Sequence, residues 1–437
     1  MLVPALLERQ LARIALTLLV AFVGEGFAAH AQLTDLEKCG DRPTVIDSEL
    51  YADTMRWCVE GILHDRGIEP LSFTAMEVAP DGTLYATRPL SGVVVAIRDT
   101  DGDELPDAMT TYAAGLTLPN GLAYYNEYLY VSGGAHIYRI SKTGAVDVVV
   151  DDLPSGTGFW TGGLAIGDGR LYVAVGAPCS NCKFDERERG AILSMNLDGS
   201  DRQIVATGFR QPADVAFYRD RLWTLDSAPH QKDRHARDEL NLVEPGGWYG
   251  FPYCLGAGER NLASADIDCA DSISPVMLFG SGAVPISLAA FPHDVLPGTK
   301  DTLIVVLSGE PSQIDFVGYK VIMITFDEEN QPLGATILIP YRYNSLRQAY
   351  QPYRGEGLYW ERFILVSESG FGIYPQQPLA VAVHPRGWIY ISMTGGRIIA
   401  LRPRQSFTKY DDRYPIWTPM NPDFDPSALP DSFEETQ

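Results

Sequence analysis

Basic side chains are scarce in this sequence. Its 437 residues include 34 lysines and arginines against 56 aspartates and glutamates, which gives a formal net charge of −22. A chain this acidic is repelled by phosphate backbones and by anionic lipid headgroups, so nucleic acid and the membrane surface are excluded as partners. Contact with a membrane would then require an uncleaved anchor segment or a membrane-bound partner.

Long hydrophobic runs are also missing, apart from one near the N-terminus. That run extends from Ile14 to Val23, follows two arginines, and precedes the small residues of Ala29-His30-Ala31. A basic start, a short apolar run and a small-x-small site are typical of a secretory signal peptide. We therefore expect residues 1–31 to be removed and the mature protein to be secreted or periplasmic. The alternative is a retained anchor that starts near Leu6.

Cysteine is limited to six residues, an even number that suits an exported chain with disulfides. Closeness in the sequence favours the pairs Cys39–Cys58, Cys179–Cys182 and Cys254–Cys269. The C-x-x-C motif at 179–182 has a second interpretation as a redox-active pair, because such a motif can lower a thiol pKa. No βαβ pattern surrounds the motif, so we expect a structural disulfide there.

Residues 73–403 repeat one short pattern. Each repeat has an apolar residue followed by alanine, then a turn, then a strand that is rich in β-branched and aromatic residues. Six such apolar-Ala pairs occur: Val78-Ala79, Leu122-Ala123, Leu164-Ala165, Val215-Ala216, Leu288-Ala289 and Val381-Ala382. Small sheets of this kind cannot bury both faces alone, but radial stacking buries them. The expected fold is therefore all-β, a six-bladed β-propeller over residues 73–403.

The segments around the repeats have a different composition. Residues 32–72 form a lead-in, in which 49–63 has the pattern of one helix. An insertion over about 329–377 is rich in Tyr, Trp and Arg between 341 and 362. It is either a cap on the propeller or a docking face for a protein partner, because these residue types dominate interface anchors. The acidic, Pro-rich tail 404–437 cannot build a core and is a second candidate for a protein contact.

One metal-binding pattern lies within the first repeat. Asp99, Asp101 and Asp103 alternate along a short segment with Gly102, and Asp107 follows. Calcium prefers many hard oxygen ligands from a tightly turning loop, and glycine permits the turn. We therefore expect a structural calcium ion on Asp99, Asp101, Asp103 and Asp107. The alternative is a solvated acidic turn.

The stretch from Phe159 to Gly256 resembles a known family. It holds the C-x-x-C motif, a Glu-Arg-Gly-Ala-Ile-Leu run at 188–193, a Gly-x-Arg turn at 208–210, and Asp-Glu-Leu-Asn at 238–241 followed by Gly-Gly-Trp-Tyr-Gly and Pro-Tyr-Cys. These features are similar to those of the soluble glucose/sorbosone dehydrogenases, and of the sorbosone branch in particular. The resemblance implies a six-bladed propeller that oxidises a sugar or alcohol with pyrroloquinoline quinone (PQQ) and calcium.

The residues that this family uses for catalysis are mostly replaced here. The resemblance places the general base, a histidine in a His-Trp-Thr motif, at Phe159, which cannot accept a proton. Gln313 and Gln377 stand where arginines are usual, and the cofactor-binding positions as a whole are Arg210, Gln211, Ala228, Pro229, Lys320 and Gln377. Because PQQ carries three carboxylates, burying it without paired cations is costly.

Two residues keep competing interpretations. Arg210 either contacts the cofactor or forms an ion pair with Asp214 or Asp226 at the propeller centre. His230 is either a substitute base or a polar loop residue.

The function that follows is a catalytically degenerate propeller, a binding or accessory subunit of an extracytoplasmic assembly. Its partner would be another protein, a small sugar or an apolar ligand. The alternatives are an active PQQ- and calcium-dependent sugar or alcohol dehydrogenase with a rearranged site, and a calcium-dependent hydrolase or lactonase.

Overall fold

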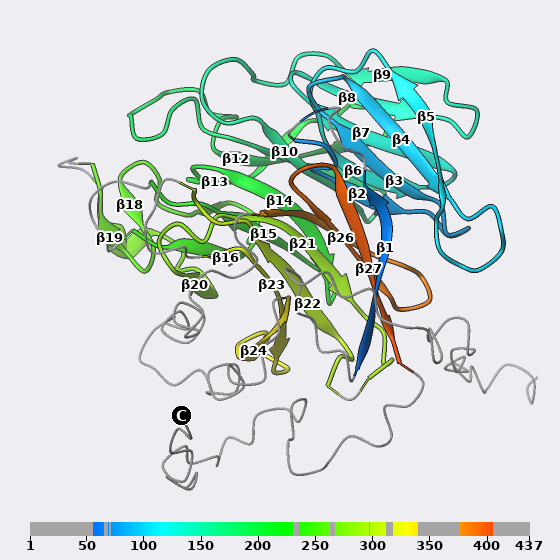
Figure 1. Ribbon diagram of the computed structural model, residues 1–437. Coiled ribbons are helices and arrows are strands. Elements are labelled where there is room, and N and C mark those ends of the chain that lie inside the picture. The colour runs from blue at the N-terminus through cyan, green and yellow to red at the C-terminus, as the bar shows by residue number, and fades with distance from the viewer. Residues whose placement is uncertain are drawn as a thin grey trace, which may run out of the picture. The chain divides into compact units, whose positions relative to one another are not determined.

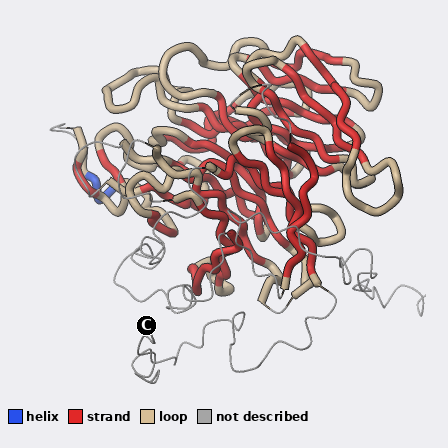
Figure 2. Tube along the Cα trace, viewed as in Figure 1, coloured by secondary structure: helices blue, strands red, loops and turns tan. Residues whose placement is uncertain are grey.

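The computed structural model describes residues 56–64, 69, 71–229, 236–262, 267–296, 298–311, 318–339 and 376–404. These residues form six sheets of four or five strands, arranged as the blades of a propeller (Figures 1 and 2). The one helix within these ranges is a single 3-10 turn, η1 (Cys269–Asp271). No helix in the described residues is long and apolar enough to cross a membrane. The expected all-β, six-bladed fold is confirmed.

The first three blades follow one another along the chain, each as an antiparallel meander. Blade 1 contains β2 (Met76–Val78), β3 (Leu84–Arg88), β4 (Val93–Arg98) and β5 (Ala108–Ala114). Blade 2 contains β6 (Pro119–Tyr125), β7 (Tyr128–Gly133), β8 (His136–Ile140) and β9 (Val146–Val150). Blade 3 contains β10 (Thr161–Gly167), β11 (Arg170–Val175), β12 (Ala191–Asn196) and β13 (Gln203–Thr207), with β17 (Gly247–Trp248) added in parallel at its outer edge.

The last three blades carry the longer connections. Blade 4 contains β14 (Pro212–Tyr218), β15 (Arg221–Asp226), β16 (Asp238–Leu242) and β20 (Met277–Phe279), and a small ribbon, β18 (Cys254–Leu255) with β19 (Glu259–Arg260), lies between its last two strands in sequence. Blade 5 contains β21 (Pro285–Phe291), β22 (Thr302–Leu307), β23 (Lys320–Phe326) and β24 (Pro332–Ile339). Blade 6 contains β25 (Pro378–Val383), β26 (Ile389–Met393) and β27 (Arg397–Pro403).

The outer strand of blade 6 comes from the other end of the chain. Strand β1 (Trp57–His64) pairs antiparallel with β27, with Trp57 opposite Pro403 and His64 opposite Arg397 (Figure 1). The helix expected over 49–63 is therefore wrong for its described part, which is this strand. The blade is completed by residues more than three hundred positions apart, so the N-terminal strand closes the ring.

Apolar side chains fill the six seams between neighbouring blades, in six separate clusters. Alternate residues of one strand serve opposite seams, because successive side chains in a strand point to opposite faces. In β22, Leu303, Val305 and Leu307 pack towards blade 4, while Ile304 and Val306 pack towards blade 6. Both faces of each sheet are thus covered, which is why a strand such as β22 is apolar at nearly every position.

The first strand of each blade lies innermost, and neighbouring first strands contact one another around the ring. Five of these six strands contain a register shift just before the apolar-Ala pair: β6, β10, β14, β21 and β25. Such a bulge re-aims side chains locally. In these five blades the bulge lies next to the residue that precedes the pair, and it turns that residue towards the centre of the propeller.

Candidate functional site

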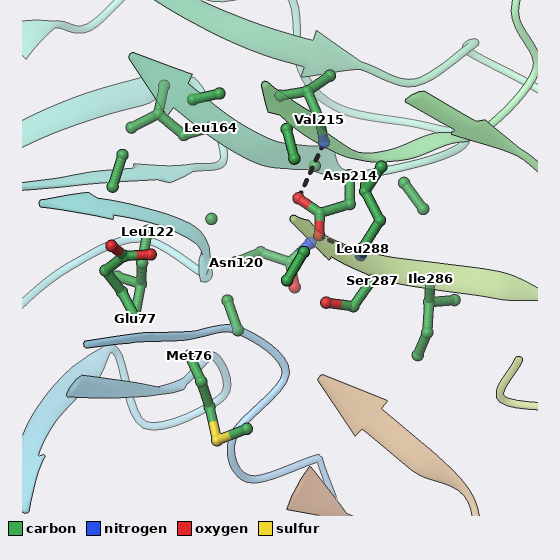
Figure 3. Close-up of a pocket in the computed structure, with 18 of the residues that line it drawn as sticks. Met76, Glu77, Asn120, Leu122, Leu164, Asp214, Val215, Ile286, Ser287 and Leu288 are labelled. Atoms are coloured by element: carbon green, nitrogen blue, oxygen red, sulfur yellow. Dashed lines mark hydrogen bonds between the residues drawn. The ribbon is translucent and has the colours of Figure 1, made fainter. Parts of the chain in front are cut away.

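The innermost strands of all six blades border a central cavity with a volume of about 620 Å³ (Figure 3). Much of its wall is apolar and includes Leu122, Leu164 and Leu288. Among the described residues, its charged side chains are two carboxyl groups, Glu77 from β2 and Asp214 from β14, and no lysine, arginine or histidine lines it. The cavity is a pocket of ligand size whose described wall has two acidic side chains and no basic one.

Both acids occupy the same position of the repeat, directly before the apolar-Ala pair. The six residues at this position, in blade order, are Glu77, Gly121, Gly163, Asp214, Ser287 and Ala380. Four of them are small, so this level of the channel is narrowed from only two sides, blade 1 and blade 4. These two blades are opposite each other in a ring of six.

Asp214 is held by backbone groups of two blades. Its Oδ1 accepts a hydrogen bond from the Val215 N–H at 2.9 Å, and its Oδ2 accepts one from the Leu288 N–H in blade 5 at 3.0 Å (Figure 3). A Cβ atom on Gly163 would lie 1.8 Å from Oδ1, so a side chain at that position is excluded. Burial raises the pKa of Asp214 to about 7, and the backbone hydrogen bonds only partly oppose the shift.

Glu77 projects from the short strand β2 into the cavity and is half-buried there (Figure 3). Burial raises its pKa to about 8, a hydrogen bond from the Tyr124 backbone lowers it, and the charge of Asp214 raises it further. Near neutral pH the carboxyl group therefore holds its proton unless a cation approaches. No described residue forms an ion pair with Glu77 or Asp214.

One end of the cavity is bordered by Phe159 and Trp160, and Trp160 remains 41% exposed. The loop that carries Phe159 is tied to the end of β11. The Phe159 N–H donates to the Ala177 carbonyl at 3.0 Å, and the Arg189 guanidinium donates to the carbonyls of Thr157 and Ala177 at 2.8 and 2.9 Å. The arginine of the Glu-Arg-Gly-Ala-Ile-Leu run thus positions the loop that holds the aromatic pair.

The Arg210 guanidinium lies against the Phe159 ring, with its central carbon 4.4 Å from the ring centroid. It donates three hydrogen bonds of 2.8 Å, to the Ser180 carbonyl, the Ser180 hydroxyl and the Ser227 carbonyl. It forms no ion pair with a described residue. The expected ion pair with Asp214 or Asp226 is therefore wrong: Asp226 instead accepts from the backbone N–H groups of Arg210 and Gln211, at 2.9 and 2.6 Å.

The remaining positions that the resemblance assigns to cofactor binding are spread over three blades. Gln211 lines the cavity beside Asp214. Ala228 and Pro229 are buried after β15, and the Ala228 N–H donates to Asp238 at 2.8 Å. Gln377 precedes β25, and its amide donates to the Gly309 carbonyl at 2.7 Å. Lys320 is 1% exposed at the start of β23, and burial lowers its pKa to about 7.

A group of buried acids in blade 4 was not identified from the sequence. Asp226 of β15 lies directly opposite Glu239 of β16, and burial raises the pKa of both carboxyl groups. Asp238, next in the chain, accepts from the N–H groups of Ala228 and Val284, and burial raises its pKa to about 7. The sequence does contain a signal for this group. Asp226 ends one apolar strand and Asp238 and Glu239 begin the next, and acids are unusual in strands that are covered on both faces.

The predicted calcium loop brings three of its four aspartates together. One carboxylate oxygen from each of Asp99, Asp101 and Asp107 lies within 4.8 Å of the others, and all three residues are exposed. Oδ1 of Asp103 instead accepts from the Leu105 N–H at 2.9 Å, within the same loop. The calcium site stays a prediction, with Asp103 outside the three-residue group.

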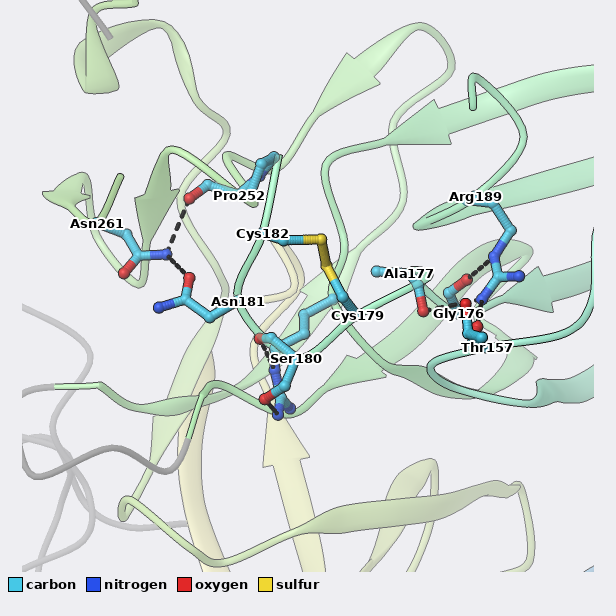
Figure 4. Close-up of a disulfide and its surroundings, with 11 residues drawn as sticks. Thr157, Gly176, Ala177, Cys179, Ser180, Asn181, Cys182, Arg189, Pro252 and Asn261 are labelled. Atoms are coloured by element: carbon cyan, nitrogen blue, oxygen red, sulfur yellow. Dashed lines mark hydrogen bonds between the residues drawn. A yellow bond between two sulfur atoms is a disulfide. The ribbon is translucent and has the colours of Figure 1, made fainter. Parts of the chain in front are cut away.

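Two of the three expected disulfides are confirmed, Cys179–Cys182 and Cys254–Cys269. Cys58 is also disulfide-bonded, whereas Cys39 lies outside the described residues, so the pairing between them stays a prediction. Within the C-x-x-C loop, the carbonyl and hydroxyl oxygens of Ser180 accept hydrogen bonds from the Arg210 guanidinium. The side-chain oxygen of Asn181 accepts a hydrogen bond from the Asn261 amide at 2.8 Å (Figure 4). The Cys179–Cys182 bridge therefore fixes the loop that holds Arg210.

The comparisons with known proteins agree with this architecture. The family model for glucose / sorbosone dehydrogenase matches residues 145–310. This range includes the C-x-x-C loop, Arg210 and the buried acids of blade 4. The resemblance to the glucose/sorbosone dehydrogenases is confirmed. No sequence among the curated proteins matches the chain.

Solved structures with the same fold include three sugar-enzyme domains. The calcium structure of the Trichoderma reesei Carbohydrate-Active Enzymes Family AA12 protein has a TM-score of 0.61 and 17% identity, over 80% of this chain and 96% of that one. The holo form of the pyranose dehydrogenase PQQ domain from Coprinopsis cinerea gives 0.59 and 11%, over 81% and 97%. The PQQ-bound aldose sugar dehydrogenase from Streptomyces coelicolor gives 0.52 and 18%, over 81% and 100%. At these identities the likeness establishes the fold.

Several expectations fall on residues outside the described ranges. They are the N-terminal segment 1–31, His230, Gln313, the aromatic and Arg-rich segment 341–362 and the tail from residue 405.

Proposed function

We propose that the chain is an exported, catalytically degenerate relative of the glucose/sorbosone dehydrogenases that works as a binding or accessory subunit of an extracytoplasmic assembly. The observation that carries this proposal is the state of Arg210. Its N–H groups serve Ser180 and Ser227, and the Phe159 ring covers one face of the guanidinium. An anionic cofactor at this arginine would have to displace the ring or break these hydrogen bonds.

The acidic groups around Arg210 oppose PQQ in the same way. Three buried acids, Asp226, Asp238 and Glu239, lie on the strands next to it, and a cofactor with three carboxylates would be placed beside groups whose ionisation burial already opposes. The amide of Gln377 already donates to Gly309, where the family uses an arginine. The described residues therefore do not fit the cofactor, and no hydride-transfer step is assigned to them.

The general base is absent from its family position as well. Phe159 borders the cavity where the resemblance places the catalytic histidine, and a phenyl ring accepts no proton. Losing a general base alone typically slows a reaction by about a hundredfold or more. Losing the cofactor contacts in addition removes the hydride acceptor.

Export is supported by the signal-like N-terminus and by the disulfides, which persist in oxidising compartments. The partner surfaces we propose are the segment 341–362 and the C-terminal tail. The ligand we propose for the cavity is a small molecule rather than a quinone. No nucleic-acid partner is proposed for a chain with a net charge of −22.

The test is reconstitution of the purified protein with PQQ and calcium. Binding is measured by equilibrium dialysis and activity by dye reduction over a panel of sugars, with the Streptomyces coelicolor aldose sugar dehydrogenase as the positive control. We expect neither stoichiometric PQQ binding nor turnover, and we expect Phe159→His to remain inactive. A stoichiometric complex that reduces the dye with glucose or sorbosone would overturn the proposal.

The second candidate is an active PQQ- and calcium-dependent sugar or alcohol dehydrogenase with a rearranged site. What supports it is the family match over residues 145–310, together with a shared fold. Fold alone is weak support for activity, because one propeller scaffold can carry many functions. The same reconstitution assay separates the two candidates.

A further inference from the structure

We propose that the central cavity binds a small aliphatic diamine, with one ammonium group at the Glu77 carboxylate and the other at the Asp214 carboxylate. This inference rests on the proposed function, because it takes the cavity to serve ligand binding and not a quinone cofactor. It concerns side chains that the glucose/sorbosone dehydrogenase resemblance did not point to.

The first argument is the charge of the cavity wall. Glu77 and Asp214 line it without any lysine, arginine or histidine among the described residues. Their polar neighbours on the wall, Asn120, Gln211 and Ser287, are uncharged. Ionising a carboxyl group that is removed from water is costly unless a cation accompanies it, so a cationic ligand is what would favour the charged form of both acids.

The second argument is the position of the two acids. Both stand directly before the apolar-Ala pair of their blade, so they lie at one level of the channel on opposite blades. Figure 3 shows Glu77 and Asp214 well separated within the pocket. The other four residues at this level are Gly121, Gly163, Ser287 and Ala380, which leave the space between the acids clear.

The third argument is what lies between and around the acids. Leucine and valine side chains, including Leu122, Leu164 and Val381, form the wall, and Trp160 stands exposed at one end. An alkyl chain suits this wall, and the face of a tryptophan ring attracts an entering ammonium group. Two cationic ends joined by an apolar chain therefore match a cavity that combines two separated acids with leucine and valine side chains.

A metal ion matches the cavity less well than a diamine. A metal ion needs several oxygen ligands around one point. Within the described structure, the only group of three or more His, Cys, Asp or Glu residues close enough for this is the exposed Asp99, Asp101 and Asp107 loop. Glu77 and Asp214 act from opposite walls, which favours a ligand with two separated charges.

The protonation state of the acids gives the proposal a distinctive signature. Burial raises the pKa of Glu77 to about 8 and that of Asp214 to about 7, so both are largely protonated at pH 6.5 without ligand. The other titratable groups on the wall are Tyr124 and Tyr125. Ammonium groups favour the ionised carboxylates, so binding must release protons, and affinity must increase as the pH rises from about 6 to 8.5.

The experiment is isothermal titration calorimetry of the purified full protein with α,ω-diamines from ethane-1,2-diamine to hexane-1,6-diamine. Butylamine serves as the single-charge control, and two buffers with different ionisation heats report the protons released. We expect one diamine length to bind best, at least about tenfold more tightly than butylamine. We expect about one to two protons to be released at pH 6.5 and close to none at pH 9.

Variants assign the site. Glu77→Gln should weaken the best diamine at least about tenfold and reduce proton release, whereas Glu329→Gln, an exposed acid in a turn of blade 5, should change neither. Asp214→Asn is the second variant, with circular dichroism as a check on folding because Asp214 also links blades 4 and 5. If Asp214→Asn does not fold, Glu77→Gln alone decides.

The outcomes are distinguishable from those of the reconstitution assay. Diamines that bind no better than butylamine, or a Glu77→Gln protein that binds like the wild type, would overturn this inference while an inactive protein still supports the accessory role. PQQ-dependent turnover would overturn the proposed function whatever the calorimetry gives.

Discussion

Glu77→Gln should make the protein more stable at high pH and leave its stability unchanged at low pH. The native state raises the pKa of this carboxyl group from 4.5 to about 8, mainly through burial. The native state therefore binds the proton more tightly than the unfolded chain does. The free energy of unfolding must fall as the pH rises from about 4.5 to 8, because the native protein then loses a proton that it holds favourably.

The size of this effect follows from the pKa values. At about 1.4 kcal/mol for each tenfold change in proton affinity, a pKa moved from 4.5 to about 8 sets an upper bound of about 5 kcal/mol. Glu77 is only half-buried, so solvent screening reduces the penalty and we expect about 2–4 kcal/mol. Glutamine has the same shape and carries no charge at any pH, so it keeps the stability of the protonated form.

The assay is urea unfolding followed by tryptophan fluorescence between pH 5 and 9, without amines in the buffer. The decisive quantity is the difference between variant and wild type, because Asp214, Asp238 and other buried acids also give the wild type a slope. The difference should be below about 1 kcal/mol at pH 5 and grow to about 2–4 kcal/mol at pH 9 in favour of Glu77→Gln. Glu329→Gln makes the same change in net charge at an exposed site and should run parallel to the wild type. A parallel curve for Glu77→Gln would refute the reasoning.

Three further outcomes test other parts of the molecule. Trp57→Ala should lower the free energy of unfolding by about 3–5 kcal/mol in urea melts, because Trp57 is fully buried in the strand that closes the ring; Trp160→Ala, at an exposed position, should change it little. Calcium should raise the melting temperature and Asp101→Ala should abolish that rise; an unchanged melting temperature on chelation would mean a simple acidic turn. Thiol labelling of protein purified without reductant should leave Cys179 and Cys182 unlabelled, and labelling of either would support a redox role.

The blade count could be read from the sequence because one local feature marks each inner strand. The apolar-Ala pair packs into two seams at once, since neighbouring residues of a strand face opposite sides, and it recurs with a turn and a second strand. In β6, for example, Leu122 belongs to the seam with blade 1 and Ala123 to the seam with blade 3. Because each of the six inner strands needs such a pair, the pair recurs six times in the sequence, and this repetition predicts the number of blades.

The closing strand was mistaken for helix because its partner is distant. Residues 57–64 have no alternation that marks a strand, and only pairing with β27 makes them one. Their first four residues are buried against blade 6, whereas the last four are mostly accessible, so no single face is apolar throughout. Local propensity is overridden here by tertiary pairing, which sequence patterns cannot report.

The candidate site was predictable in part. The motifs point to Phe159 and Arg210, but not to the contact between them. Of the two interpretations of Arg210, a cofactor contact or an ion pair with an acid, the ion pair is not formed, because the guanidinium donates to carbonyl and hydroxyl oxygens. Glu77 and Asp214 were visible as the only acids directly before an apolar-Ala pair. Their placement on opposite sides of one channel could not be predicted, because it depends on how the six blades close into a ring.

The division between seams and channel allows the channel residues to vary while the fold is kept. Stability resides in the six apolar seams, whereas the channel level before each pair contributes little apolar contact and can vary. Small residues at this level carry no desolvation penalty, and four blades have them. The acids in blades 1 and 4 do carry one, since burial opposes their ionisation and no described cation offsets it. Asp214 gains hydrogen bonds across two blades and Glu77 accepts one from the Tyr124 backbone in blade 2, but no described cation accompanies either carboxyl group, which argues for a cationic ligand between them.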